Sequence, residues 1–159
     1  MQNPQTVRYR LTPALATFCL QLRGHMKPLV TILVAYGSWH IGARVIHRLS
    51  TLPCVRVIGQ CREADDAVAH VVTGRPDLVV LDLLLARGDG LGVLRAIRRE
   101  ASPPVVFMTS STRYPQTRRE CLREGADSFF TLPDEIDALV LAVEERALGA
   151  RAAAGGECA

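Results

Sequence analysis

Five short apolar runs alternate along the chain with segments whose apolar residues recur every three to four positions. Runs such as V-V-L and V-V-F-M lack the polar alternation of half-exposed strands, which is typical of strands that are buried on both faces of a sheet. The five runs lie at residues 31–35, 55–59, 78–81, 105–108 and 128–131. Because strands that alternate with helices join through right-handed crossovers, the pattern predicts a single-domain α/β fold with a doubly wound, five-stranded parallel sheet.

The intervening segments differ in how clearly they predict helices. Four carry an apolar stripe at helical spacing. The stripes are Ile41, Val45, Ile46 and Leu49; Ala64, Ala67, Val68 and Val71; Leu91, Leu94 and Ile97; and Ile136, Leu139, Val140 and Val143. The segment 116–124 has only Cys121 and Leu122 as apolar residues, so we expect a short, loosely held helix there. Asp134 follows Pro133 and is the expected N-cap of the last helix.

The two ends of the chain are expected to lie outside the folded domain at residues 29–148. Residues 1–28 form an N-terminal extension, and Met26 directly precedes the first strand, so residues 1–25 are either absent from the native protein or a docked helix. The apolar stretch 11–22 is shorter than the roughly 20 residues a membrane span needs, and no signal-peptide cleavage site follows it. Residues 149–159 are small and glycine-rich, which predicts a disordered tail.

Charge and cysteine content exclude several classes of protein. The net charge is +3, but residues 1–27 carry four basic and no acidic groups, which leaves 15 basic and 16 acidic groups in the body. The body therefore lacks the basic footprint of a nucleic-acid-binding protein. The five cysteines are scattered without a C-x-x-C pair, which argues against a disulfide framework and a zinc site. This cysteine usage is compatible with the reducing cytoplasm.

The residues that follow the predicted strands are the candidates for a functional site. A doubly wound sheet binds its ligands beyond the carboxyl ends of its strands. The positions there are Ala35, Tyr36, Asp82, Thr109, Ser110, Leu132 and Pro133. Asp82 follows the apolar run V-V-L directly, and a carboxylate at the end of a buried strand is costly unless it is paired or used. It either caps the following loop or takes part in chemistry.

Three segments resemble the receiver domains of bacterial response regulators, the CheY-like family. The stretch D-L-L-L-A-R-G-D-G-L from Asp82 resembles the phosphoacceptor segment of the family. The stretch V-V-F-M-T-S at 105–110 resembles its fourth strand. The stretch G-A-D-S-F-F-T-L-P at 125–133 resembles the segment that leads to a Lys-Pro pair. The resemblance covers about residues 29–148. It implies a non-enzymatic module of two-component or phosphorelay signalling, with Asp82 as candidate phosphoacceptor, Thr109 as the pocket hydroxyl and Phe129 as the switch aromatic. It also implies a cis peptide bond between Leu132 and Pro133.

The phosphorylation chemistry that the resemblance implies lacks several of its residues here. The family holds Mg²⁺ with the phosphoacceptor and two acids at the end of the first strand, where this chain has Ala35 and Tyr36. The family lysine is replaced by Leu132, and the only lysine, Lys27, lies upstream of the sheet. We therefore expect an atypical receiver with no metal, no cofactor and no catalytic residue. In this interpretation Tyr36 fills the pocket and bonds Asp82, and His40 is a remote candidate for a replacement cation.

Two other interpretations stay open. One is a conventional receiver, in which a histidine kinase phosphorylates Asp82 with Mg²⁺. The other, less favoured, is a cofactor-binding enzyme, suggested by the turn from Gly37 to Gly42, which matches neither G-x-G-x-x-G nor a P-loop. For a receiver, the resemblance implies a protein partner or self-association through the fourth helix, fifth strand and fifth helix, near residues 113–124, 129–131 and 135–146. We expect neither a nucleic-acid nor a membrane partner.

Overall fold

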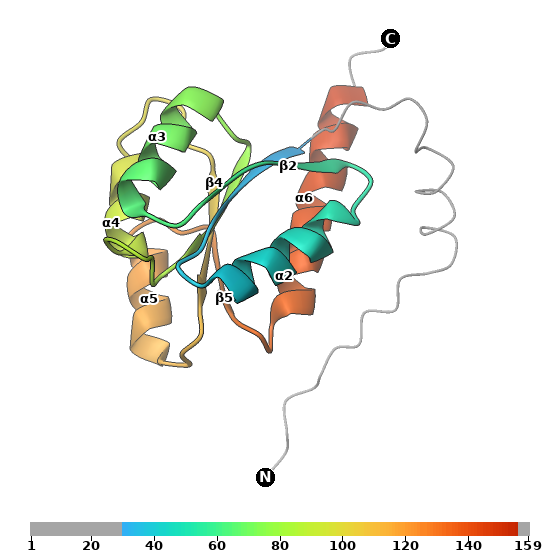
Figure 1. Ribbon diagram of the computed structural model, residues 1–159. Helices are drawn as coiled ribbons and strands as arrows, with labels where there is room; N and C mark the ends of the chain where they lie inside the picture. Colours follow the sequence, from blue (N-terminus) through green and yellow to red (C-terminus); the bar gives the residue numbers. More distant parts are fainter. Residues whose placement is uncertain (1–29, 156–159) are drawn as a thin grey trace.

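The computed structural model describes residues 30–155, with side chains described for residues 30–150 (Figure 1). Strands and helices alternate throughout this part of the chain. The elements are β1 (Val30–Ala35), α2 (Trp39–Ser50), β2 (Val55–Cys61), α3 (Ala64–Gly74), β3 (Leu78–Asp82), α4 (Gly90–Ile97), β4 (Val105–Ser110), α5 (Pro115–Arg123), β5 (Ser128–Thr131) and α6 (Ile136–Gly155). The strands form one parallel sheet in the order β2-β1-β3-β4-β5. This confirms the predicted doubly wound α/β fold.

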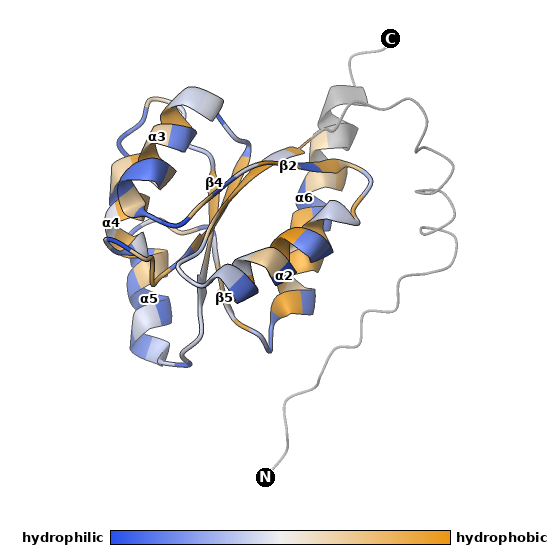
Figure 2. Cartoon of the chain, viewed as in Figure 1, coloured by the Kyte–Doolittle hydropathy of each residue, from blue (hydrophilic) through white to orange (hydrophobic). Residues whose placement is uncertain are grey.

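Helices cover both faces of the sheet, which explains why the inner strands β3 and β4 are buried without alternation. Helices α3, α4 and α5 lie on one face, and α2 and α6 lie on the other (Figure 1). Every residue of β3 is buried, with Val79 and Leu81 in one apolar cluster and Leu78 and Val80 in the other. The middle of the sheet is accordingly strongly hydrophobic, whereas the helices mix polar and apolar residues (Figure 2).

Three strands run further toward their carboxyl ends than the apolar runs suggest. Strand β2 extends to Cys61, β3 to Asp82 and β4 to Ser110. Pairing with neighbouring strands continues through these polar residues, and Asp82 is in register with Thr109. The extensions therefore place polar side chains of adjacent strands next to one another.

The last two helices differ in how firmly they are anchored. Helix α5 buries only Cys121, as expected for a weakly striped segment. Helix α6 begins at Ile136, so the expected N-cap at Asp134 is wrong. The carboxylate of Asp134 instead pairs with Arg113, on the loop between β4 and α5.

The disordered tail expected at residues 149–159 is wrong for residues 149–155, because α6 continues to Gly155. Residues 147–154 are five alanines with Leu148, Gly149 and Arg151, and the helix preference of alanine, leucine and arginine outweighs the one glycine. The predicted extension at residues 1–28 and the last four residues of the tail lie outside the described residues. No helix of the described part has the length and apolar character that crossing a bilayer requires.

Candidate functional site

The carboxyl edge of the sheet brings together three of the predicted site residues. Tyr36 directly follows β1, Asp82 ends β3, and Thr109 lies near the end of β4. Tyr36 is 1% exposed, Asp82 8% and Thr109 0%. Because side chains alternate along strands, all three lie on the face that carries α2 and α6.

Tyr36 and Thr109 form a direct hydrogen bond. The Thr109 hydroxyl donates to the Tyr36 hydroxyl oxygen at 2.9 Å, and the Leu81 carbonyl is a more distant acceptor at 3.5 Å. Strand β3 lies between β1 and β4, so the phenol crosses the end of β3 to reach Thr109. The expected bond from Tyr36 to Asp82 is wrong in this structure, since among the described residues the phenol bonds Thr109.

Asp82 lies in a setting that disfavours its charged form. Burial raises the pKa of the carboxyl to about 6. The backbone amides of Leu83 and Leu84 and the Thr109 hydroxyl lower this pKa, but they offset the burial only in part. Six ion pairs are seen within residues 30–150, and Asp82 takes part in none of them.

Tyr36 is a neutral phenol at physiological pH. Burial raises its pKa far above the ordinary value of 10.0, and the charge of Asp82 raises it further. The hydrogen bond from Thr109 lowers the pKa, by less than burial raises it. Tyr36 therefore supplies no negative charge at the end of β1.

The remaining positions singled out from the family pattern are part of the core. Ala35 is 0% exposed and packs on the face that carries α3, α4 and α5. Leu132 is 3% exposed and belongs to the same apolar cluster as Tyr36. The peptide bond between Leu132 and Pro133 is cis, as predicted.

Phe129 lies apart from this group. Its ring is 3% exposed and packs in the cluster on the other face of the sheet. The guanidinium carbon of Arg118 lies 5.9 Å from the ring centroid, within the range of a cation–π contact. The structure therefore does not place the predicted switch aromatic against Tyr36.

The loops beside the site are tied together by contacts that the sequence analysis missed. The Gly37 amide donates to the Leu84 carbonyl at 3.2 Å, and the Arg62 guanidinium donates to the Gly37 carbonyl at 3.0 and 3.3 Å. A Cβ atom on Gly37 would lie 2.5 Å from the Leu84 oxygen, so this glycine permits the close approach of two loops. No sequence signal identifies an arginine after a strand as one that joins two loops.

His40, the remote candidate for a replacement cation, is exposed on α2.

The donor atoms available for a metal ion are few. Among residues 30–150, no three His, Cys, Asp or Glu side chains are grouped closely enough to hold one. Ala35 offers no ligand atom, and the Tyr36 hydroxyl is neutral and hydrogen-bonded.

Comparison with known proteins identifies relatives along most of the described chain. The family model described as "Response regulator receiver domain" matches residues 42–144, which is more than half of the chain. The transcriptional regulatory protein DltR of Streptococcus agalactiae is 33% identical over 85 residues, covering 53% of this chain and 38% of DltR. A protein-glutamate methylesterase/protein-glutamine glutaminase of Symbiobacterium thermophilum is 31% identical over 105 residues, covering 65% of this chain and 29% of that protein. The chain thus spans less than two fifths of these two relatives.

Solved structures share the fold. The signal receiver domain of the response regulator NarL from Mycobacterium tuberculosis superposes with a TM-score of 0.69 at 26% identity, covering 76% of this chain and 97% of that one. A chain of the CheX-CheY-BeF3-Mg complex from Borrelia burgdorferi superposes with a TM-score of 0.65 at 21% identity, covering 73% of this chain and 87% of that one.

Proposed function

The chain belongs to the response regulator receiver family, and from this premise we propose that it is an atypical receiver that signals through protein contacts. In this proposal Mg²⁺-dependent phosphorylation of Asp82 contributes little or nothing. The contact between Tyr36 and Thr109, inside the cluster that also holds Leu132, is the observation that carries the proposal.

The residues present do not fit a magnesium ion. Mg²⁺ prefers six oxygen ligands in octahedral geometry, and in proteins carboxylates supply part of that set. Asp82 supplies one carboxylate, whereas Ala35 supplies none and the Tyr36 phenol stays protonated. A single buried carboxylate would bind the ion weakly, so we derive no step that passes through it.

The site also lacks a fixed positive charge. Phosphoryl transfer depends on positioning and on neutralising the charge that spreads over the phosphoryl oxygens. Leu132 is apolar and buried, and the guanidinium of Arg62 is bonded to the Gly37 carbonyl. The Thr109 hydroxyl, which would have to turn toward a phosphoryl group, already donates to Tyr36.

A partner surface is supported by side chains of α5 and β5 and of the loops that precede α5 and α6. Arg113 pairs with Asp134, and Arg118 lies 3.9 Å from Glu135. These groups border a cavity of about 280 Å³ that Tyr114 and Phe129 also line. Exposed ion pairs contribute little to folding, so replacing them with intermolecular pairs would cost little stability. The related CheY in complex with CheX is an example of a receiver bound to another protein.

The second candidate function is that of a conventional receiver phosphorylated by a histidine kinase. The position of Asp82 at the end of β3 favours this function, because a phosphoacceptor at the carboxyl edge of the sheet lies beside the loops that follow the strands. The cofactor-binding enzyme receives less support, since the contact of Gly37 with Leu84 explains the glycine without a phosphate.

The deciding experiment is incubation with acetyl phosphate and Mg²⁺, read by intact mass. Wild type is expected to gain no phosphoryl group, while the variant Tyr36→Asp/Leu132→Lys, shown to be folded by circular dichroism, is expected to gain one. Adding Asp82→Asn to that variant should abolish the gain. Efficient labelling of wild type that is lost in Asp82→Asn alone would overturn the proposal in favour of the conventional receiver.

A further inference from the structure

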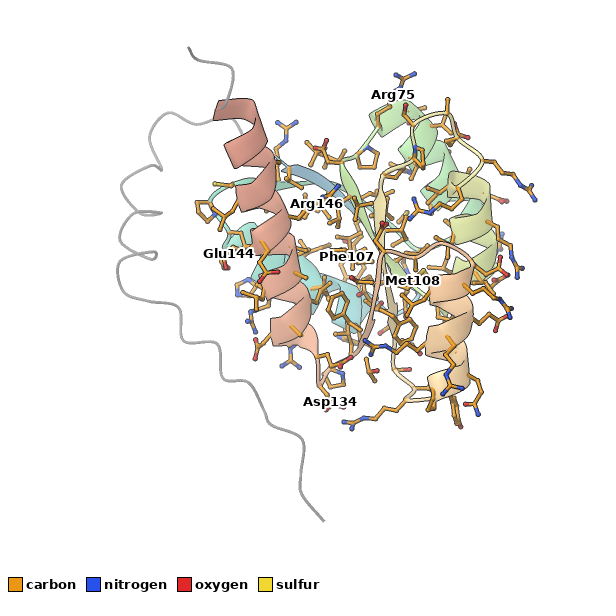
Figure 3. All side chains as sticks on the ribbon, turned by 180° about the vertical axis from the view of Figure 1, so that it is seen from behind. Arg75, Phe107, Met108, Asp134, Glu144 and Arg146 are labelled. Atoms are coloured by element: carbon orange, nitrogen blue, oxygen red, sulfur yellow. The ribbon has the colours of Figure 1, made fainter. Side chains whose placement is uncertain are left out.

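A second cavity, of about 470 Å³, opens at the amino ends of the strands, remote from Asp82. It lies between the end of α3, the segments that enter β3 and β4, and α6. Its lining includes Val72, Arg75, Pro76, Asp77, Glu100, Ser102, Pro103 and Arg146. Arg75 and Arg146 lie toward this end of the molecule, and Asp134 marks the opposite end (Figure 3). Its volume falls within the range of about 300–1,000 Å³ that is usual for small-molecule sites.

Two arginines from different elements line this cavity. Arg75 follows α3, whereas Arg146 lies on α6. Neither guanidinium is within 4.0 Å of an acidic group in the part of the chain whose side chains are described. Of the fourteen arginines of the same part, six have such a partner and eight, these two among them, do not. Arg75 and Arg146 are the two of these eight that line the cavity, and no acidic group neutralises them at close range.

The two acids of the lining differ in what they can do. The carboxylate of Asp77 accepts hydrogen bonds from the Thr31 amide and the Thr31 hydroxyl, both at 2.7 Å, so it is used in fixing β3 against β1. Glu100 is exposed and has no ion pair within residues 30–150. It remains available as an acceptor for a ligand N–H or O–H.

The backbone of Arg75 supports a role for its side chain. Arg75 has φ 42° and ψ 58°, and it is the one non-glycine residue of the described part with positive φ. Its amide bonds the Val71 carbonyl at 3.0 Å, and Pro76 disfavours a right-handed helical conformation at position 75. Glycine is the residue that usually ends a helix in this conformation. Arginine at this position costs stability and supplies a cation to the cavity.

We infer that this cavity binds a small organic phosphate with a hydrogen-bond donor, such as a nucleoside monophosphate. Arg75 and Arg146 contact the phosphate oxygens, since the planar guanidinium matches oxyanions in pairs of hydrogen bonds. Glu100 accepts from the organic part, which packs against Val72 and Pro103. The ligand would act on the receiver from the end opposite to Asp82.

Isothermal titration of the full chain with GMP, AMP and inorganic phosphate, in EDTA, tests the inference. At least one nucleotide is expected to bind more tightly than inorganic phosphate. Arg75→Gly and Arg146→Ala should each weaken that binding about tenfold or more, as the loss of a charge-assisted contact predicts. Arg119→Ala should leave it unchanged, because Arg119 is exposed on α5, outside the cavity.

The glycine variant separates binding from folding. Arg75→Gly relieves the left-handed backbone, so its melting temperature should equal or exceed that of wild type while binding is lost. Absence of binding by both nucleotides at millimolar concentration would overturn the inference. If Arg119→Ala weakened nucleotide binding as much as the two cavity variants do, the inference would also be overturned. Such a result would show that the nucleotide is attracted to the positive charge of the protein in general. Labelling with acetyl phosphate is a separate readout, so this inference and the proposed function can fail independently.

Discussion

The hydroxyl of Thr109 on β4 donates a hydrogen bond to the hydroxyl of Tyr36, which follows β1, at 2.9 Å across the end of β3. Both side chains are almost completely buried. The phenol therefore links two strands that are not neighbours in the sheet, at the edge where Asp82 lies. This arrangement gives specific expectations for stability.

Removing the Tyr36 hydroxyl should destabilise the fold modestly. Tyr36→Phe keeps the buried ring but removes the phenol partner of Thr109, and the Leu81 carbonyl, at 3.5 Å, is a poorer acceptor. A buried hydrogen bond contributes about 1 kcal/mol, so the free energy of unfolding in urea should fall by about that amount. Tyr114→Phe is the matched control, because Tyr114 is 65% exposed. Equal stability of Tyr36→Phe and wild type would show that the bond contributes nothing.

Restoring the family lysine should cost stability when it is done alone. Leu132 is 3% exposed in the cluster with Tyr36, and an ammonium group placed there loses its hydration. Leu132→Lys is expected to lower the free energy of unfolding by about 2–4 kcal/mol. Leu132→Met, which conserves volume and polarity, should cost less than about 1.5 kcal/mol. If the lysine variant unfolds at the same urea concentration as wild type, position 132 is not a sealed core site.

Asp82 should make stability depend on pH between about 4 and 6. Its pKa rises from 3.8 to about 6 in the fold, so the protonated form stabilises the native state below about pH 4. That contribution is lost as the pH rises through about 6. At pH 7.5 in EDTA, Asp82→Asn should therefore be more stable than wild type by about 1–3 kcal/mol.

The gain from Asp82→Asn should shrink to nearly nothing at pH 4, where both side chains are neutral. Thermal unfolding at the two pH values measures the difference. Asp65→Asn, at an exposed position of α3, controls for a general effect of removing a carboxylate. A gain of the same size at both pH values would mean that burial of charge at Asp82 is not its cause.

The fold, and the meeting of three candidate residues at one edge of the sheet, could be predicted because both depend on local pattern, whereas Phe129 lies on the other face. The apolar runs mark strands, and the parallel sheet then requires Tyr36, Asp82 and Thr109 to meet at one edge. The partner of Tyr36 could not be predicted, since its hydrogen bond depends on how far the ring reaches across β3. The same holds for the tie from Arg62 to Gly37, which joins two loops. The extension of α6 beyond residue 148 could not be predicted, because there the helix propensity of alanine-rich residues outweighs the absence of an apolar face to bury.

The contact between Gly37 and Leu84 gives a last test of how tightly the site edge is closed. A Cβ at position 37 would lie 2.5 Å from the Leu84 carbonyl oxygen and 2.9 Å from the Leu85 carbonyl carbon, both backbone atoms. Neither can move without shifting the loop after β3, so Gly37→Ala should destabilise the fold by about 1–3 kcal/mol in urea. Gly149→Ala is the matched control, because nothing lies within 4 Å of its Cβ position on α6. In that helix alanine should be neutral or stabilise by up to about 1 kcal/mol. Similar effects of the two changes would show that the loops are not held in contact, and that the edge beside Asp82 is more open than this structure indicates.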